Sequence, residues 1–198
     1  SGTGYRGGNR DLSRALTAAT DDNGSIIKST GNTAIEFVAL FADEIHVLQF
    51  GADGISNDKT AVEAFTAYLS GVSNGATGVI SDIDLNIASN STLAAGCNIR
   101  VEQGGVFSIA TGATLNFDSS LDAGLYQIFD LTGTGTVDWS SYTGTREMPV
   151  EWYGAIACAE SGAEIQTTLL QAEGQNMIVL LNGSYINNTT NLVTTNRI

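Results

Sequence analysis

The sequence is poor in positive charge and contains no long apolar run. Of its 198 residues only eight are lysine or arginine, and the formal net charge is −13. Nucleic acids and anionic membrane surfaces are bound by basic patches, so we expect neither as a partner. No apolar run reaches the 18 residues typical of a membrane-spanning helix, and we expect no membrane insertion.

Cysteine and histidine are equally scarce. Cys97 and Cys158 lie far apart and outside any Cys-x-x-Cys spacing, and we interpret both as small buried hydrophobic residues, with a disulfide as the alternative. His46 is the single histidine and has no cysteine or histidine near it, so no metal site is predicted. One histidine also leaves no conventional catalytic triad. We therefore assign no catalytic, cofactor-binding or metal-binding residue, and expect no cofactor.

The chain has one proline but 23 glycines, which suits many short strands joined by glycine turns. Apolar and polar residues alternate with a period of two in several segments, and this pattern indicates strands. The alternation predicts strands at 77–87, 99–101, 106–109 and 113–117. Further strands are predicted at 25–28, 126–129 and 136–139, at the continuous apolar run 177–181, and at 185–186 and 192–193. The fold class predicted is mainly β with short capping helices.

A strand–turn–helix motif stands before these strands. Phe50, Gly51 and Ala52 end an apolar segment, and Gly51 and Gly54 allow the positive φ of a tight turn. Asp58 is predicted to be the N-cap of a helix, because its carboxylate can accept the unpaired N–H groups of the first turn. Residues 59–69 carry the apolar spacing of an amphipathic helix.

A second copy of this motif follows 103 residues later. Tyr153, Gly154 and Ala155 correspond to Phe50, Gly51 and Ala52. Ser161 takes the place of Asp58, and with Glu164 it matches the Ser-x-x-Glu capping box. Internal similarity of this kind indicates two successive elements of one architecture.

The two motifs resemble the start signature of pectate-lyase-like right-handed β-helices, above all those of bacteriophage tailspikes. The resemblance is carried by Phe50-Gly51-Ala52-Asp53-Gly54 with Asp58-Lys59-Thr60-Ala61-Val62-Glu63-Ala64, and by Pro149-Val150-Glu151-Trp152-Tyr153-Gly154-Ala155. It departs from the family pattern at Lys59, where a second Asp is common, and the second copy lacks the Asp-Gly turn.

The resemblance implies a small β-domain followed by the start of a right-handed parallel β-helix in a homotrimer. Residues 1–48 are then a turn-rich segment, with a short helical stretch at 12–19 and an apolar linker helix at 33–48 forming a trimer neck. Residues 49–146 are a first capped β-domain, and 147–198 are a cap helix with the first rungs of a second β-helix. Because the sequence starts at Ser1 rather than Met, we expect a piece of a longer protein.

Three functions follow as hypotheses. The first is a structural part of a tailspike in the virion, outside the host cell, bound to other tail or baseplate proteins and linked to a β-helix that binds host polysaccharide. The second is a polysaccharide depolymerase, for which Asp82 and Asp84 are the closest carboxylate pair. Their alternative interpretation is a solvated strand face. The third is a glycan-binding adhesin module using Trp139, Tyr142 or Trp152, whose alternative role is packing.

Overall fold

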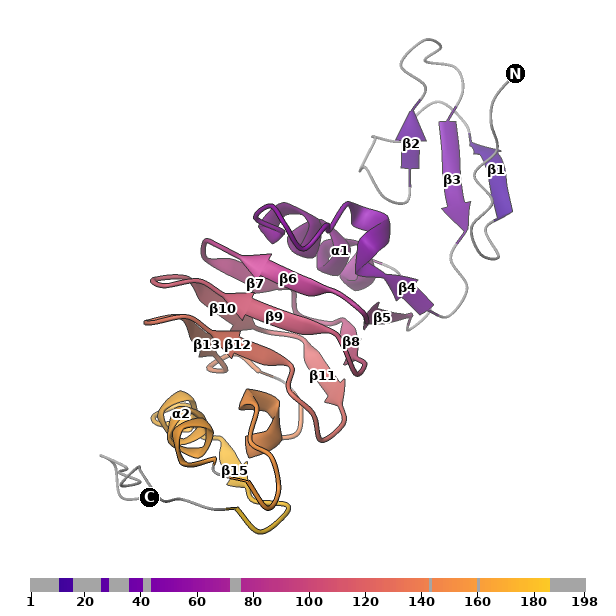
Figure 1. Ribbon diagram of the computed structural model, residues 1–198. Helices are drawn as coiled ribbons and strands as arrows, with labels where there is room; N and C mark the ends of the chain where they lie inside the picture. Colours follow the sequence, from indigo (N-terminus) through magenta and orange to yellow (C-terminus); the bar gives the residue numbers. More distant parts are fainter. Residues whose placement is uncertain are drawn as a thin grey trace.

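The chain forms a mainly β molecule, as the sequence predicts (Figure 1). The computed structural model describes residues 44–71, 76–142, 144–159 and 161–185, together with the backbone of three strands nearer the N-terminus. Those three strands form an antiparallel sheet in the order β1-β3-β2. They are β1 (Asp11–Ala15), β2 (Ile26–Lys28) and β3 (Glu36–Leu40).

The predicted linker helix at 33–48 is wrong. Strand β3 occupies its middle, β4 (Glu44–His46) follows, and the 3-10 helix η1 (Val47–Phe50) takes its end. The short helical stretch at 12–19 is wrong in the same way, since β1 begins it. Segments with apolar residues on all sides and several β-branched or aromatic residues favour strands once partners are present, and β4 has such a partner in the distant strand β5.

Nine strands make three parallel sheets, which we call the stack. One sheet contains β5, β8 and β11, with β4 added at its edge; the second contains β6, β9 and β12; the third contains β7, β10 and β13. The strands are β5 (Thr77–Ile80), β6 (Asp84–Ile87), β7 (Ser91–Leu93), β8 (Asn98–Val101), β9 (Val106–Ile109), β10 (Thr114–Phe117), β11 (Ser120–Ala123), β12 (Phe129–Leu131) and β13 (Thr136–Asp138).

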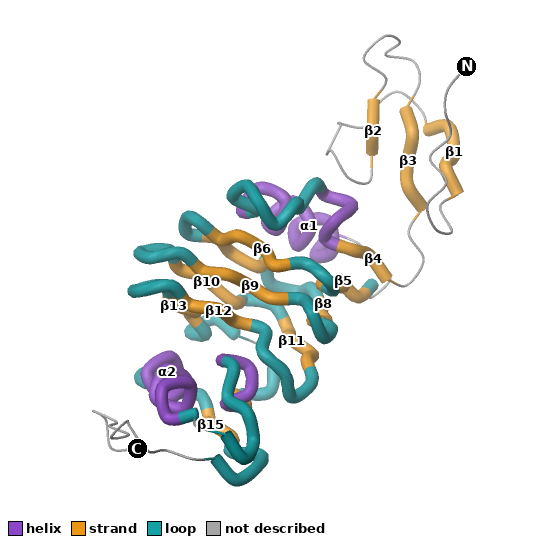
Figure 2. The backbone as a smooth tube through the Cα atoms, in the orientation of Figure 1, coloured by secondary structure: helices purple, strands orange, loops and turns teal. Residues whose placement is uncertain are grey.

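The chain visits the three sheets in the same order three times, and each strand pairs in parallel with the strand three before it. Figure 2 shows the resulting layers of strands, one turn of the chain above the next. In the last turn the partners are 22 residues apart in every sheet, as in Asn98–Ser120, Phe107–Phe129 and Leu115–Val137. The strand segments predicted from 25 to 139 are confirmed with two exceptions: the segment 77–87 is two strands of different sheets, β5 and β6, interrupted at 81–83, and the segment 126–129 becomes a strand only at Phe129. The strands predicted at 185–186 and 192–193 lie outside the described residues, apart from Tyr185, which is not in a strand.

Aromatic side chains fill the interior of the stack, one turn above another. Phe107 stacks on Phe129 with ring centroids 5.9 Å apart, and Phe117 stacks on Trp139 at 4.9 Å. All four rings are at most 1% exposed. Pairs of this geometry add about 0.5–1.5 kcal/mol each beyond the burial of their area. Like residues on successive turns thus hold the three sheets around one core.

Each end of the stack is covered by a helix (Figure 1). The first module consists of β4, η1, α1 (Lys59–Gly71) and β5, and the second consists of β14 (Glu147–Pro149), η2 (Val150–Tyr153), α2 (Gly162–Ala172) and β15 (Ile178–Leu180). The helices α1 and α2 begin directly after Asp58 and Ser161, where the sequence predicts them to begin. Strand β15 confirms the strand expected at 177–181. The main core continues across the boundary predicted at 147, since it includes Met148, Trp152 and Tyr153.

Candidate functional site

Asp58 is the most highly connected polar residue of the first module. Its carboxylate is 3% exposed and accepts the backbone N–H groups of Asp53 at 2.9 Å, Gly54 at 3.2 Å and Asn86 at 2.9 Å. Its own N–H donates to the Asn86 carbonyl at 2.8 Å. Asp58 stands just before α1, and its carbonyl accepts the Val62 N–H at 2.9 Å, whereas the N–H groups that donate to its carboxylate come from the turn and from β6. It therefore ties the module to the stack.

Ser161 makes the matching bond in the second module. Its hydroxyl accepts the Ile156 N–H at 2.9 Å, and Ile156 lies 103 residues after Asp53. The predicted capping box is wrong, because the Ser161 side chain makes no hydrogen bond to the helix start although the residue stands at the N-cap position. The Ser161 hydroxyl is instead hydrogen-bonded to the Ile156 backbone in the turn before the helix.

Two glycines end the 3-10 helices with the same backbone conformation. Gly51 has φ 90° and ψ 15°, and Gly154 has φ 94° and ψ 6°. Residues with a Cβ atom rarely adopt this left-handed backbone conformation, so glycine is favoured at both positions. Each glycine N–H donates to the carbonyl three residues earlier, Leu48 in one copy and Glu151 in the other.

The two modules correspond element by element. In both, the first strand pairs in parallel with the last, β4 with β5 and β14 with β15. The motif residues Phe50, Ala52, Tyr153 and Ala155 are all buried. The first three elements begin 103 residues apart, at Glu44 and Glu147, Val47 and Val150, and Lys59 and Gly162.

The second module closes the open edge of the stack with side chains that sequence reasoning missed. Gln171 Oε1 accepts the Val137 N–H at 2.8 Å. Gln175 accepts the Trp139 N–H and donates to the Val137 carbonyl at 3.2 Å. The Trp152 carbonyl accepts the Ile128 N–H at 3.0 Å. An open strand edge is a template for aggregation, and these groups occupy it. The only signal in the sequence was the presence of two glutamines, Gln171 and, four residues later, Gln175 in the turn after α2.

The two candidate carboxylates do not lie on one strand, although the sequence pattern predicts that they do. Asp82 lies in a turn with φ 51°, and Asp84 begins β6; both are exposed. Asp84 accepts a hydrogen bond from the Ser108 hydroxyl of the next turn. The solvated interpretation of this pair is the one the structure bears out.

The three aromatic residues proposed for glycan contact are buried. Trp139 is fully buried, Tyr142 is 3% exposed and Trp152 is 5% exposed. Trp152 stacks on Trp139 at 6.2 Å and donates its indole N–H to the Gly124 carbonyl at 3.1 Å. The packing interpretation is confirmed for all three, and they offer no exposed face to a sugar.

His46 and Ser81 form the only contact among described residues that could suggest a nucleophile and its base. His46 Nε2 lies 3.4 Å from Ser81 Oγ, near the ion pair of Arg100 with Glu44 at 2.7 Å. His46 Nδ1 is buried without a hydrogen-bond partner in the described residues. A base at Nε2 needs its proton on Nδ1, where the described residues offer no acceptor. They therefore do not set up Ser81 as a nucleophile.

The cysteines differ in their surroundings. Both are free; Cys97 is buried, as predicted, whereas Cys158 is exposed, so that part of the prediction is wrong. Burial raises the pKa of the Cys97 thiol to about 11. Within the described residues no group of three or more histidine, cysteine or acidic side chains is placed to bind a metal ion. Nor does any helix in this part of the chain have the length and apolarity to cross a membrane.

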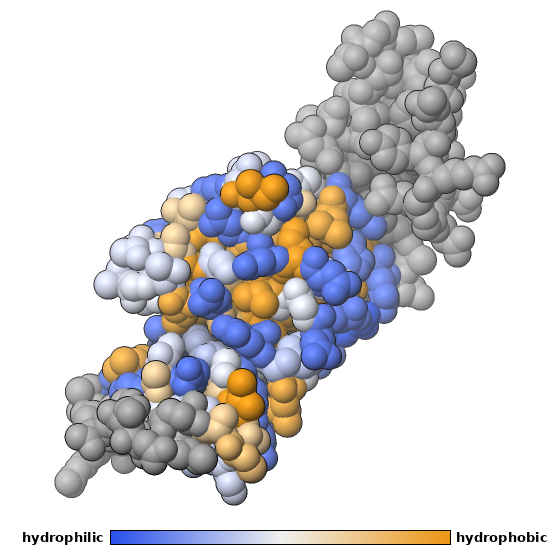
Figure 3. Space-filling view, viewed as in Figure 1, coloured by the Kyte–Doolittle hydropathy of each residue, from blue (hydrophilic) through white to orange (hydrophobic). Residues whose placement is uncertain are grey.

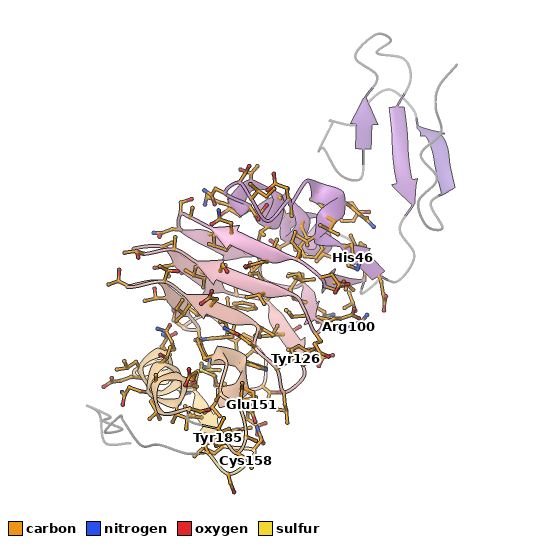
Figure 4. All side chains as sticks on the ribbon, in the orientation of Figure 1. His46, Arg100, Tyr126, Glu151, Cys158 and Tyr185 are labelled. Atoms are coloured by element: carbon orange, nitrogen blue, oxygen red, sulfur yellow. The ribbon has the colours of Figure 1, made fainter. Side chains whose placement is uncertain are left out.

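A buried carboxylate in the second module is paired rather than reactive. Glu151 is 9% exposed, and it accepts a hydrogen bond from the Tyr185 hydroxyl (Figure 4). Asn182 Nδ2 lies 3.5 Å from its other oxygen. Burial and then the neighbouring Glu151 raise the pKa of Tyr185 to about 12. These contacts fasten the segment after β15 onto η2.

Two shallow hollows lie where the second module meets the stack. One of about 260 Å³ has Asp130 and Glu164 in its lining, and the other of about 270 Å³ has Asp122 and Glu147. Their linings contain no described lysine, arginine or histidine. Figure 3 shows hydrophilic and hydrophobic residues interspersed over the visible face of the stack.

Comparison of the chain with known protein families, curated proteins and solved structures finds no match. The likeness to tailspikes therefore depends on the motif residues named above.

Proposed function

We propose that this chain is a structural, non-catalytic part of a trimeric bacteriophage tailspike. It connects the end that binds other tail or baseplate proteins to a β-helix that binds host polysaccharide. The observation that carries the proposal is the repeated module: one copy covers the first end of the stack and the other covers its last edge. A β-rich unit with a cap at either end suits a rigid spacer in a virion.

We take the stack to be a short right-handed parallel β-helix. Its support is the constant order in which the chain visits three parallel sheets, with partners 22 residues apart. Stacked like residues such as Phe107 and Phe129 are the expected interior of such a coil. This is the fold that the motif resemblance implies.

The second module has the beginning of another core, which supports a second coil after it. Its small cluster of buried residues corresponds, 103 residues on, to three members of the first core. The pairs are Val47 with Val150, Ala52 with Ala155, and Val62 with Ile165. In the first module such residues lie beneath the turns that follow. Ile80 follows the β5 residues that pair with β4, and Leu181 follows the β15 residues that pair with β14. Ile80 is fully buried, whereas Leu181 is 59% exposed.

The mass of the purified chain in solution tests the trimer. Light scattering at micromolar concentration should give about three times the 20.6 kDa of one chain. A mass of one chain, unchanged up to the highest soluble concentration, would contradict a trimeric role for this segment.

A second experiment separates this function from the two alternatives. The chain is incubated with capsular or O-antigen polysaccharide, and reducing ends, unsaturated sugars and binding are measured. We expect neither cleavage nor binding. Cleavage that Asp82→Asn or Asp84→Asn abolishes would support the depolymerase, and binding by single chains without cleavage would support the adhesin module.

A further inference from the structure

The second module covers the edge of β13 but leaves part of the edge of β11 open. On its paired side β11 bonds to β8, and the Ser120 N–H donates to the Cys97 carbonyl there at 3.1 Å. Backbone groups of successive residues in a strand point to alternate sides, so those of Leu121 and Ala123 point away from β8. The Leu121 backbone is hydrogen-bonded to the Tyr142 hydroxyl. For the N–H and carbonyl of Ala123 the described residues supply no hydrogen bond.

Strand β14 has an open edge on the same hollow. It pairs with β15, where the Arg146 carbonyl accepts the Ile178 N–H at 2.8 Å. By the same alternation the backbone groups of Glu147 point away from β15, and no described residue bonds to them. Ala123 and Glu147 both line the hollow of about 270 Å³, which we call the junction groove. Two open strand edges therefore border one groove, although β11 and β14 do not pair with each other among the described strands.

The two edges present the same pattern of side chains. Leu121 and Ala123 pack against the main core, and Asp122 between them is exposed. In β14 Met148 lies in that core, and Glu147 before it is exposed. Side chains of a strand point alternately to its two faces. A strand placed in the junction groove would therefore direct one set of side chains inward to apolar residues and the other set outward, between Asp122 and Glu147.

The charge of the groove favours a basic occupant. Asp122 and Glu147 form no ion pair within the part of the chain that the structure describes. Arg100 is the register neighbour of Asp122 on β8, but its guanidinium is already engaged. It pairs with Glu44 at 2.7 Å and with Glu102 at 3.1 Å. Two uncompensated carboxylates attract a cationic side chain and disfavour the edge of a second acidic chain.

We propose that the junction groove binds an extended segment of another protein that carries a lysine or arginine. The segment makes main-chain hydrogen bonds to Ala123 on one side and to Glu147 on the other, and its basic side chain lies between the two carboxylates. Because β11 has four residues and β14 has three, the segment contributes only a few residues to the sheet. In such strand addition the main chain supplies affinity, and the alternating side chains supply specificity.

Amide hydrogen exchange in the full chain tests whether the two edges are open. After correction for intrinsic rates, the Ala123 and Glu147 amides should exchange at least about tenfold faster than those of Asp122 and Met148, which point to the paired sides. Equal protection of all four amides would overturn the proposal. So would protection of Ala123 that grows with protein concentration, because that result identifies a second copy of the chain as the occupant.

A capped pentapeptide tests the chemistry of the occupant. It has valine at positions two and four and arginine at position three, and a second peptide has glutamate in place of the arginine. We expect the arginine peptide to protect the Ala123 and Glu147 amides and to bind at least about tenfold more tightly than the glutamate peptide, with a difference that shrinks as salt is added. Asp122→Asn combined with Glu147→Gln should remove this preference.

The matched control is Asp130→Asn combined with Glu164→Gln. It removes two carboxylates from the other hollow and changes the net charge by the same amount. The control should keep the preference for arginine, and circular dichroism should show that both double variants retain the fold. Loss of the preference in the control as well would show a general attraction to an acidic chain and would overturn the proposal. Equal binding of the two peptides, or no protection of the two amides at millimolar peptide, would overturn it too.

Discussion

The buried carboxylate of Asp58 makes more hydrogen bonds within the first module than the N-cap role predicted from the sequence requires. Three backbone N–H groups donate to it, from a turn, a glycine and a strand of the stack. In the second copy Ser161 stands at the equivalent position, and of these bonds it makes only the one to the turn. The side chain at this position therefore accepts three backbone N–H groups in the first module and one in the second.

We expect Asp58→Ala to lower the free energy of unfolding by about 3 kcal/mol, because three backbone N–H groups lose the acceptor that the buried carboxylate provides. Ser161→Ala, which removes one acceptor, is the matched control and should cost about 1 kcal/mol. Urea denaturation followed by circular dichroism measures both. Equal losses for the two variants would show that the additional bonds of Asp58 contribute little.

The Cys97 thiol gives the fold a dependence on alkaline pH. Burial raises its pKa from about 9 to about 11. The folded chain therefore retains the proton while the unfolded chain releases it, so this stabilisation is complete below pH 9 and is lost as pH rises toward 11. We expect the unfolding midpoint in urea to fall between pH 8 and pH 10, and to fall less in Cys97→Ala. Parallel declines in the two proteins would contradict the assignment.

At the scale of the element, sequence reasoning succeeded where local pattern and tertiary structure agree. The helix after Asp58 and the strands with alternating residues, such as Leu85 and Ile87 in β6, have one face buried and the other more exposed. The helix predicted at 33–48 was wrong. The apolar spacing there is helical, but the residues also favour strands, and pairing with a distant segment, as of β4 with β5, determines the structure. Sequence reasoning also missed β7 and β11, which are short, serine-containing strands held by their parallel neighbours.

The candidate site was predictable only in part for the same reason. The glycine turns follow from the backbone rules, and the repeat is visible as a constant offset of 103 residues. The roles of Gln171 and Gln175 depend on where α2 lies relative to β13, which no local pattern fixes. Which carbonyl or N–H a side chain meets is a property of the packed chain.

Gln171 of α2 and Gln175 of the turn after it should behave as caps of the strand edge. We expect Gln175→Ala to lower the free energy of unfolding by about 2 kcal/mol and Gln171→Ala by about 1 kcal/mol, because backbone groups of β13 are left unpaired. Leu170→Ala, at a half-exposed position of the same helix, is the control and should change it by less than about 0.5 kcal/mol.

The double variant should also associate, since an uncovered strand edge can pair with another chain. Dynamic light scattering of Gln171→Ala with Gln175→Ala against Leu170→Ala measures this. A double variant as stable and as monodisperse as the control would mean that α2 does not protect the edge.

At the scale of the whole molecule, the second module belongs energetically to the stack before it. The aromatic column runs from Phe117 through Trp139 to Trp152, and thus from the stack into η2. Met148 and Met177 are in the same core. A chain organised in this way unfolds as one body across residue 147.

Equilibrium unfolding followed by two probes tests this claim most directly. The only two tryptophans, Trp139 and Trp152, lie at the junction, so their fluorescence reports its opening, while far-ultraviolet circular dichroism reports the strands. The account predicts coincident transitions in urea with one midpoint. A fluorescence transition completed at lower urea, with the circular dichroism of the strands retained, would show that the second module is a separate unit and would contradict its role as the cap of the stack.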